Sequence, residues 1–272
     1  MIVKFFKYHG AGNDFIIIDE RQQDILSHIT ENHTIISALC HRRFGIGADG
    51  LMILRSHHEY DFHMFYYNSD GYEGSMCGNG GRCLTAFASH QGIIENKTVF
   101  LASDGLHKAT INSDDGHFSS VSLSMNDVTN IRETDYGLFL DTGSPHIVKF
   151  TEDLLQIKVE SEGKNIRNAD TFRPLGTNVN FVAIVDDNLH IRTYERGVEN
   201  ETLACGTGIT AAAIAAFHKG FISKNNIEVI ARGGLLNVSF SPGPQGYRDI
   251  ILTGPAQKVF EGEIQLSNLM IQ

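Results

Sequence analysis

Two cysteine-containing stretches of similar sequence restrict the possible folds of this chain more than any other feature. The first, SMCGNGGRC, places Cys77 directly before a glycine-rich turn, and the second, ACGTG, does the same for Cys205. A segment of helical character follows each cysteine and ends at a glycine, Gly92 or Gly220, fifteen residues after its cysteine. A glycine just after the last periodic residue is a common helix stop signal. The equal spacing predicts a duplicated unit in which a thiol opens a helix.

The segments around the two cysteines also match. FYYNSDG precedes Cys77 and RTYERG precedes Cys205, so an aromatic strand ends in a polar turn before each thiol. We pair DFIIIDE (Asp14 to Glu20) with NFVAIVDD (Asn180 to Asp187), because both are apolar runs of strand length that end on acidic residues. Further short strands are expected at KTVFLAS, SSVSLSM and NIEVIA.

The segment GITAAAIAAFHK is apolar almost all round, which predicts a buried helix. A sheet wrapped around one central helix, present twice, would satisfy this burial and the short strands. We therefore expect an α+β fold of two pseudo-symmetric lobes, each a mixed β-barrel-like sheet around a central helix. The strand SSVSLSM puts the junction between the lobes near Asn126.

Composition and charge exclude several classes of partner. The chain has 272 residues, of which 42% are hydrophobic and 20% charged, as expected for a globular protein with two lobes. Its formal net charge of −10 argues against a nucleic-acid partner, which would favour a basic surface. We find no apolar stretch long enough to span a bilayer and no signal peptide, so we expect a cytoplasmic protein without a membrane partner.

The four cysteines do not form a typical disulfide or zinc pattern. Cys77 and Cys83 are six residues apart, which does not match a zinc knuckle, and Cys205 has no cysteine or histidine close by. Cys40 lies in a helical pattern, HTIISALCHRR, and is expected to be a small buried residue. We therefore expect no metal and no disulfide framework.

A thiol at the start of a helix can serve two purposes. The unpaired N–H groups and the positive end of the helix dipole can hold a carboxylate, and they also lower the pKa of a thiol. A single Cys-Gly turn is more often a packing feature, but two matched copies favour a functional site. If the lobes face one another, a substrate α-carbon would lie in the cleft between the thiols of Cys77 and Cys205. Inversion of a stereocentre needs a base on one face and an acid on the other, and two thiols supply both without a cofactor.

Six motifs lie along the chain in the order seen in one enzyme family. They are HGAGNDF, RRFGIGADGL, NSDGYEGSMCGNGGRC, GSPHIV, TNVNFV and YERGVENETLACGTG. Through them the chain resembles the diaminopimelate epimerases over nearly its whole length. The resemblance implies a cofactor-independent isomerase that interconverts LL- and meso-diaminopimelate in lysine and peptidoglycan precursor biosynthesis. We expect a homodimer.

The resemblance also implies where the lobes begin and end. The first lobe would comprise residues 1–122 and 261–272, and the second would comprise residues 123–260. The segment EGEIQL would return to the first lobe as its last strand. The active site would lie in the cleft between the lobes.

Residue roles follow from the same motifs. Cys77 and Cys205 match the acid/base pair of the family. The positions that hold the reacting carboxylate match Gly78, Asn79, Gly206 and Thr207. Other substrate contacts match Asn13, Asn68, Asn178, Glu195 and Arg196. The planar guanidinium of Arg196 suits a distal carboxylate, and Glu195 can pair with an ammonium group.

Several positions leave alternatives open. Asn68 and Asn178 would also suit turns, and we favour the functional interpretation for both. His146 and Ser144 are further candidates for the site. Ser144 stands where many family members have Asn, and Gly50 stands where some have Gln.

Two other functions compete with this interpretation. Proline racemases and hydroxyproline epimerases share the two thiols, but they usually carry His at the position of Asn79. Their ring substrate lacks a distal charge, so Arg196 favours diaminopimelate. A thiol redox or metal-binding protein would instead use Cys77 with Cys83 and give Cys205 no role.

Overall fold

The computed structural model describes residues 1–21, 33–74, 76–186 and 188–269. Its contacts divide the chain into two compact units. Unit 1 comprises Met1–Leu123 and Pro255–Gln272, and unit 2 comprises Ser124–Gly254. We expected the chain to return to the first lobe at residue 261. In the structure, unit 1 resumes earlier, at Pro255. The reason is that Gln257 and Lys258 already pair with the first strand. Residues 270–272 of that expected segment lie outside the described part.

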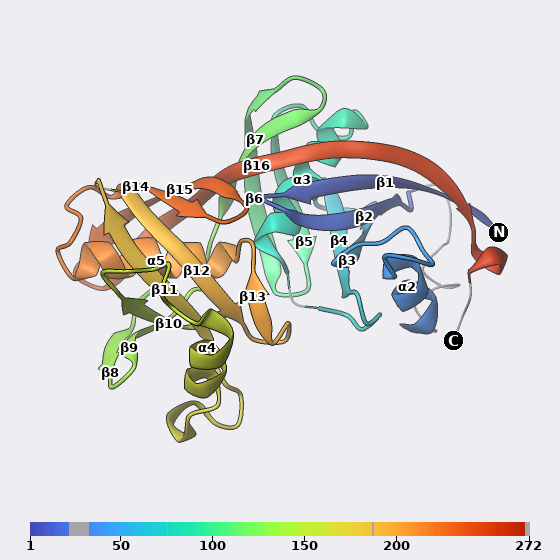
Figure 1. Cartoon of the computed structure of the whole chain (residues 1–272). Helices are drawn as coiled ribbons and strands as arrows, with labels where there is room; N and C mark the ends of the chain where they lie inside the picture. The colour runs from blue at the N-terminus through green and yellow to red at the C-terminus, as the bar shows by residue number, and fades with distance from the viewer. Residues whose placement is uncertain (22–32, 75, 187, 270–272) are drawn as a thin grey trace. The chain divides into compact units, whose positions relative to one another are not determined.

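Unit 1 surrounds one helix with strands (Figure 1). Its described elements are β1 (Ile2–Gly10), β2 (Asn13–Asp19), α2 (His33–Cys40), β3 (Gly50–Arg55), β4 (Phe62–Asn68), α3 (Gly78–His90), β5 (Lys97–Ala102), β6 (Gly105–Asp114), β7 (Phe118–Ser124), the second part of β16 (Gly246–Gln265) and the short 3₁₀ helix η2 (Leu266–Asn268). The strands pair in the order β1 to β7, and β16 lies beside both β7 and β1, which closes the sheet into a barrel. Helix α3 is buried from Gly78 to Ala88.

Unit 2 has the same plan. Its described elements are β8 (Ile131–Thr134), β9 (Gly137–Asp141), β10 (Pro145–Phe150), α4 (Val159–Arg167), the 3₁₀ helix η1 (Asp170–Phe172), β11 (Asn178–Val185), β12 (Asn188–Glu195), β13 (Asn200–Thr202), α5 (Gly206–His218), β14 (Asn226–Ala231), β15 (Gly234–Gly243) and the first part of β16. The strands follow the order β8-β9-β10-β11-β12-β14-β15-β16, with β13 beside β12. Helix α5 is buried along most of its length, as its apolar sequence predicts.

Strand directions confirm the duplication. From β1 to β7, successive pairs are antiparallel, parallel, antiparallel, parallel, antiparallel and antiparallel. The path β9-β10-β11-β12-β14-β15-β16 repeats this series. Our pairing of DFIIIDE with NFVAIVDD was wrong by one strand, because β2 corresponds to β10 and β11 corresponds to β3. Adjacent buried strands are all apolar runs, so composition alone could not fix their order.

The two central helices begin and end in the same way. Each has 13 residues, and each follows a cysteine whose backbone is extended. Gly92 and Gly220 have φ values of +67° and +70°, and each helix closes with the paired hydrogen bonds of a Schellman motif. The helix ends that the sequence predicts at Gly92 and Gly220 are therefore confirmed. Among the described residues, no helix is long and apolar enough to cross a membrane.

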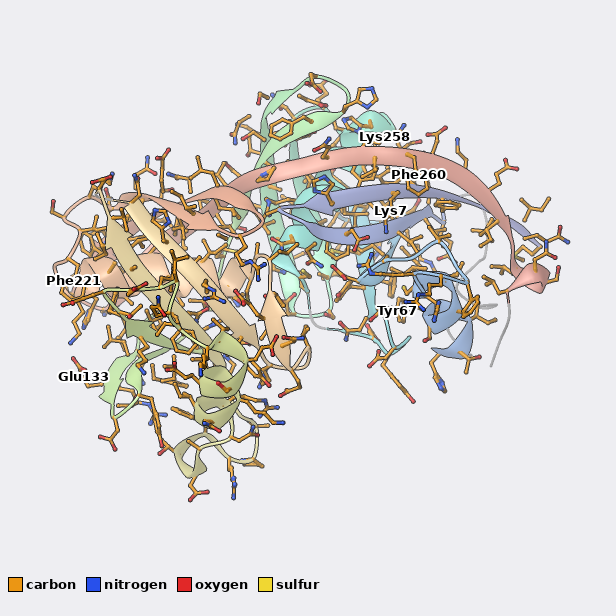
Figure 2. The ribbon with its side chains drawn as sticks, viewed as in Figure 1. Lys7, Tyr67, Glu133, Phe221, Lys258 and Phe260 are labelled. Atoms are coloured by element: carbon orange, nitrogen blue, oxygen red, sulfur yellow. The ribbon has the colours of Figure 1, made fainter. Side chains whose placement is uncertain are left out.

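The segment EGEIQL returns to unit 1, as the resemblance implied. Its residues pair antiparallel with β1, from Phe6 with Glu261 to Ile2 with Gln265. Figure 2 labels Phe260 and Lys258 on the adjoining part of β16. The ring of Phe260 packs edge-on against Phe5, with 6.0 Å between the ring centroids, so this part of β16 is held by side chains as well as by the backbone.

A buried ion pair joins β1 to β2 in unit 1. Lys7, labelled in Figure 2, has a side chain that is 8% exposed, and its Nζ lies 2.7 Å from Oδ2 of Asp14. Arg42 contacts the other oxygen of Asp14 at 2.7 Å. Burial alone would raise the pKa of Asp14, but the hydrogen bonds and charges of Arg42 and Lys7 hold this pKa well below its ordinary value.

We predict that Asp14→Asn lowers the free energy of unfolding by about 3 kcal/mol at neutral pH, because it leaves the buried Lys7 without its anionic partner. The folded-state pKa of Asp14 is depressed, so its contribution is complete above the ordinary carboxyl pKa of 3.8 and declines as the pH falls towards the depressed value. Urea unfolding at neutral pH and near pH 3 should show a smaller difference between wild type and variant in acid.

Asp19→Asn is the matched control on the same strand. Asp19 pairs with Arg21, and both side chains are partly exposed, so its loss should cost less than about 1 kcal/mol. A difference between wild type and Asp14→Asn that is equal at both pH values would contradict the ion-pair interpretation.

Candidate active site

The first thiol lies beside a fixed asparagine in unit 1. Sγ of Cys77 is 3.6 Å from Oδ1 of Asn13, and Nδ2 of Asn79 donates to the same oxygen at 3.3 Å. On its other side, Nδ2 of Asn13 donates to Oδ2 of Asp49 at 2.7 Å. A carboxylate can only accept, so Asp49 turns the Asn13 oxygen towards Cys77 and Asn79.

Asp49 connects two of the sequence motifs, and the sequence analysis gave it no role. It belongs to the motif RRFGIGADGL, whose Arg42 donates to Oδ1 of Asp49 at 2.6 Å and also contacts Asp14. Asp14 directly follows Asn13 in the motif HGAGNDF. The only signal in the sequence was the recurrence of charged residues in two motifs that lie far apart along the chain.

A buried arginine supports the start of α3. The side chain of Arg82 is fully buried, and its Nη2 donates to Oδ1 of Asn79 at 2.8 Å. Longer hydrogen bonds of 3.4 Å reach the carbonyl oxygens of Gly78 and Pro255. Burial lowers the pKa of Arg82. A cation beside the positive end of a helix dipole makes this site suited to an anion. The sequence analysis missed Arg82, although it is the only Lys, Arg, Asp or Glu in α3.

Glycines near Cys77 also allow close packing. A Cβ on Gly80 would lie 2.9 Å from Sδ of Met52, and one on Gly10 would lie 3.1 Å from the carbonyl oxygen of Asn79. A side chain at either position would push its neighbour away, so glycine favours the close approach of helix α3 to the strands. Packing explains part of the glycine-rich turn, in addition to any role in binding.

The second thiol lies in a similar place in unit 2. Cys205 is buried and extended at the start of α5, and its Sγ is 3.5 Å from Oγ1 of Thr207. The hydroxyl of Thr142 donates to the carbonyl oxygen of Thr207 at 2.9 Å. Thr142, which is itself buried, thus fixes the first turn of α5. The sequence analysis did not identify this residue.

Asn178 holds the candidate residues Ser144 and Arg196. Its Nδ2 donates to Oγ of Ser144 at 2.9 Å and to the carbonyl oxygen of Pro145 at 3.0 Å. Its Oδ1 accepts from the backbone N–H of Arg196 at 2.9 Å. Among the described residues, the guanidinium of Arg196 makes long hydrogen bonds of 3.4 Å, to Ser144 and to the carbonyl oxygen of Leu175. Asn178 therefore shapes the backbone here, and Glu195 lies next to this point at the end of β12.

His146 is fully buried at the start of β10. Its Nδ1 lies 3.0 Å from Nδ2 of Asn180, which is also buried. Burial, followed by the charge of Arg196, lowers the pKa of His146 to about 3. The ring is therefore neutral at physiological pH.

Gly50 stands where some members of the resembling family have Gln, and this difference has a steric explanation. Gly50 lies opposite Asn68 in the pair formed by β3 and β4. A Cβ on Gly50 would lie 2.6 Å from Cε2 of Tyr66 and 2.7 Å from the carbonyl oxygen of Tyr67. The ring of Tyr66 therefore occupies the space that a larger residue at position 50 would need. Asn68 itself is exposed at the end of β4.

The other two cysteines are poor reactive thiols. Cys83 is fully buried, and burial raises its pKa far above the ordinary thiol value. Burial likewise raises the pKa of Cys40 to about 12. Both therefore stay protonated, which argues against a redox pair of Cys77 and Cys83. Within the described ranges, no group of three or more His, Cys, Asp or Glu side chains could hold a metal ion.

We predict that Gly50→Gln alone lowers the free energy of unfolding by about 1–3 kcal/mol, because the new side chain overlaps the ring of Tyr66. Adding Tyr66→Ala should recover part of this loss, so the double variant should be more stable than the sum of the single variants implies. Urea unfolding of the four proteins measures this coupling. Strictly additive effects would show that the ring does not occupy the space at position 50.

Comparisons with known proteins identify the family. The sequence model of diaminopimelate epimerase matches residues 5–130 and 138–259. The diaminopimelate epimerase of Flavobacterium psychrophilum is 50% identical over 263 residues, covering 96% of this chain and 100% of that protein. That of Aquifex aeolicus is 40% identical and covers 96% of this chain and 98% of that protein.

Solved structures show the same fold at low sequence identity. A Bacillus anthracis phenazine biosynthesis protein of the PhzF family has a TM-score of 0.77 at 14% identity, covering 97% of this chain and 99% of that chain. A probable proline racemase from Agrobacterium radiobacter has a TM-score of 0.66 at 15% identity, covering 97% of this chain and 93% of that chain. These similarities confirm the α+β fold of two pseudo-symmetric lobes. The family model and the full-length relatives agree on one family, and the chain therefore belongs to the diaminopimelate epimerases.

Proposed function

We propose that this protein interconverts LL- and meso-diaminopimelate by proton transfer at the α-carbon, with Cys77 and Cys205 as the acid/base pair. The observation that carries the proposal is the matched start of α3 and α5, where each buried helix begins directly after an extended cysteine. The 50% identity to a diaminopimelate epimerase supports the substrate.

In this proposal the two units face one another across the substrate. The thiolate of one cysteine removes the α-proton, and the thiol of the other donates a proton to the opposite face of the same carbon. Negative charge moves towards the reacting carboxylate in the transition state. The N–H groups at the start of each helix, near Gly78, Asn79, Gly206 and Thr207, stabilise that charge. This chemistry needs no bound cofactor.

The remaining substrate contacts are assigned to Asn13, Asn68, Asn178, Glu195 and Arg196. Arg196 supports this assignment, because its guanidinium hydrogen bonds to other described residues are 3.4 Å long and a distal carboxylate would give it a stronger, charged acceptor. The hydroxyl of Ser144 lies beside it and takes the place of the amide found in many family members. Asp49 holds Asn13 with its oxygen towards Cys77, which keeps the thiol beside the substrate.

We also propose that the protein acts as a homodimer in the cytoplasm, in the synthesis of lysine and peptidoglycan precursors. Support comes from the resemblance to the family. Light scattering in solution tests the oligomeric state. A mass of twice 30.1 kDa is expected, and a mass of 30.1 kDa would contradict the dimer.

The decisive variants are Cys77→Ala and Cys205→Ala. We predict that each lowers the rate of epimerisation by about 100- to 10,000-fold, because each removes the group that serves one face of the carbon. The rate is followed by chromatographic separation of the LL and meso isomers. Circular dichroism should show that the fold is retained.

Cys40→Ala is the control, since this buried thiol has no part in the proposed chemistry. It should change stability and leave turnover close to that of wild type. Near-normal turnover in either Cys77→Ala or Cys205→Ala would contradict the two-base proposal. Turnover of proline or hydroxyproline in place of diaminopimelate would show that the protein is a proline racemase or hydroxyproline epimerase.

A further inference from the structure

Glu199 lies in the turn between β12 and β13 with an unusual backbone conformation. Its φ is +58°, in the left-handed region that residues with a side chain rarely adopt because it costs free energy. Its N–H donates to the carbonyl oxygen of Glu195 at 2.8 Å, so the turn that contains Arg196 is closed by a hydrogen bond. Such a conformation persists where the surrounding structure holds it, and residues of this kind cluster at functional sites.

The carboxylate of Glu199 supplies contacts that hold this turn. Oε1 accepts from Nε of Arg167 at 2.8 Å and from the backbone N–H of Gly197 at 3.0 Å. Oε2 accepts from the hydroxyl of Tyr194 at 3.2 Å. Burial alone would raise the pKa of Glu199, but the hydrogen bonds from Gly197 and Arg167 hold this pKa below its ordinary value. The side chain is therefore ionised at neutral pH while it accepts three hydrogen bonds.

Arg167 connects this turn to a second loop. It lies in the last turn of α4, a helix that packs against β12 and β13 (Figure 1). A Cβ on Gly176 would overlap the guanidinium of Arg167, so this guanidinium lies directly against the backbone of Gly176. The preceding residue, Leu175, offers its carbonyl oxygen to Arg196. Arg167 therefore contacts both the turn that contains Arg196 and the loop that accepts from its guanidinium.

The backbone of Arg196 is held more firmly than its guanidinium. The N–H of Arg196 donates to Oδ1 of Asn178 at 2.9 Å, and the turn that follows is closed at Glu199. By contrast, the guanidinium reaches Ser144 and the carbonyl oxygen of Leu175 at 3.4 Å, near the upper limit for a hydrogen bond. The place of the guanidinium therefore depends on the shape of the turn.

We propose that Glu199 is a positioning residue that, together with Arg167, holds the turn of residues 195–200 so that Arg196 meets the distal carboxylate of the substrate. The role of Arg196 rests on the proposed function, whereas the order of the turn does not. The distal carboxylate takes no part in the proton transfer. Its contact with Arg196 therefore contributes equally to the ground state and the transition state, and a weaker contact raises KM with little effect on kcat.

Hydrogen exchange of the free protein, followed by NMR, tests the order of the turn. Two backbone N–H groups report on it: that of Arg196, which donates to Asn178, and that of Glu199, which donates to Glu195. Glu199→Gly removes the carboxylate, while glycine adopts a positive φ readily. We expect both N–H groups to exchange about tenfold faster in this variant, because the turn opens more easily. Equal exchange rates in wild type and variant would overturn the proposal.

Three other variants separate the carboxylate from the flexibility of glycine. Arg167→Ala leaves the turn sequence unchanged and should speed the exchange of the same N–H groups. Glu199→Gln keeps an oxygen for Arg167 and Gly197, and its NH₂ group can donate to the hydroxyl of Tyr194, so its exchange should stay within about threefold of wild type. Asp170→Asn, which removes one negative charge from an exposed ion pair, is the control and should exchange like wild type. Fast exchange in Glu199→Gly with no change in Arg167→Ala would also overturn the proposal.

Kinetics distinguish positioning from a merely structural role. Glu199→Gly should raise KM for diaminopimelate by about tenfold, the effect of losing one hydrogen bond, with a smaller change in kcat. Added to Arg196→Ala, it should raise KM no further, because Glu199 acts through Arg196. A further rise in the double variant would show a general structural role and contradict the proposal.

The proposed function fails separately from the role of Glu199. If wild type does not epimerise diaminopimelate, the proposed function is wrong, while hydrogen exchange of the free protein still decides whether Glu199 holds the turn. If Arg196→Ala leaves KM unchanged in an active enzyme, the contact between Arg196 and the distal carboxylate is overturned.

Discussion

The burial of each central helix along most of its length creates the constraint on which the rest of this structure depends. The first N–H groups of a helix have no partner inside the helix and need an acceptor from elsewhere. In α3 and α5, neither of the residues preceding the helix supplies a side-chain cap. Both helices are also enclosed by their own strands, which limits access to water. In the proposed function, the carboxylate of the substrate is the acceptor for these N–H groups in both units.

Each unit fixes its cysteine turn with different groups. In unit 1, Asp49 orients Asn13 beside Cys77, and the buried guanidinium of Arg82 holds Asn79. In unit 2, Thr142 holds the backbone of Thr207, and Asn180 packs against Gly208. Thr210 occupies the position in α5 that Arg82 occupies in α3, five residues after the cysteine. The duplication thus preserves the helix starts and their glycine stops, whereas the polar groups around them differ.

The sequence was sufficient to predict features that depend on local chemistry. Cysteine before glycine, a uniformly apolar helix and a glycine at a fixed distance identified both central helices and both thiols. The order of equivalent strands was not predictable, because apolar runs such as β2 and β11 look alike whatever their neighbours are. The roles of Arg82, Glu199 and Tyr66 depend on groups that meet only in the folded protein. Gly197 holds the carboxylate of Glu199 through a backbone N–H, and a main-chain group leaves no signal in the sequence.

The central claim is that two thiols serve opposite faces of one carbon, and solvent deuterium tests it most directly. A donating thiol exchanges its proton with water before it is used, so in D₂O each newly formed epimer should carry deuterium at the α-carbon from its first appearance. The remaining starting isomer should gain deuterium more slowly. Mass spectrometry of both isomers during the first turnovers measures these two rates. Product that forms early with its original α-hydrogen would show that a single base carries the same proton across, and it would contradict the account.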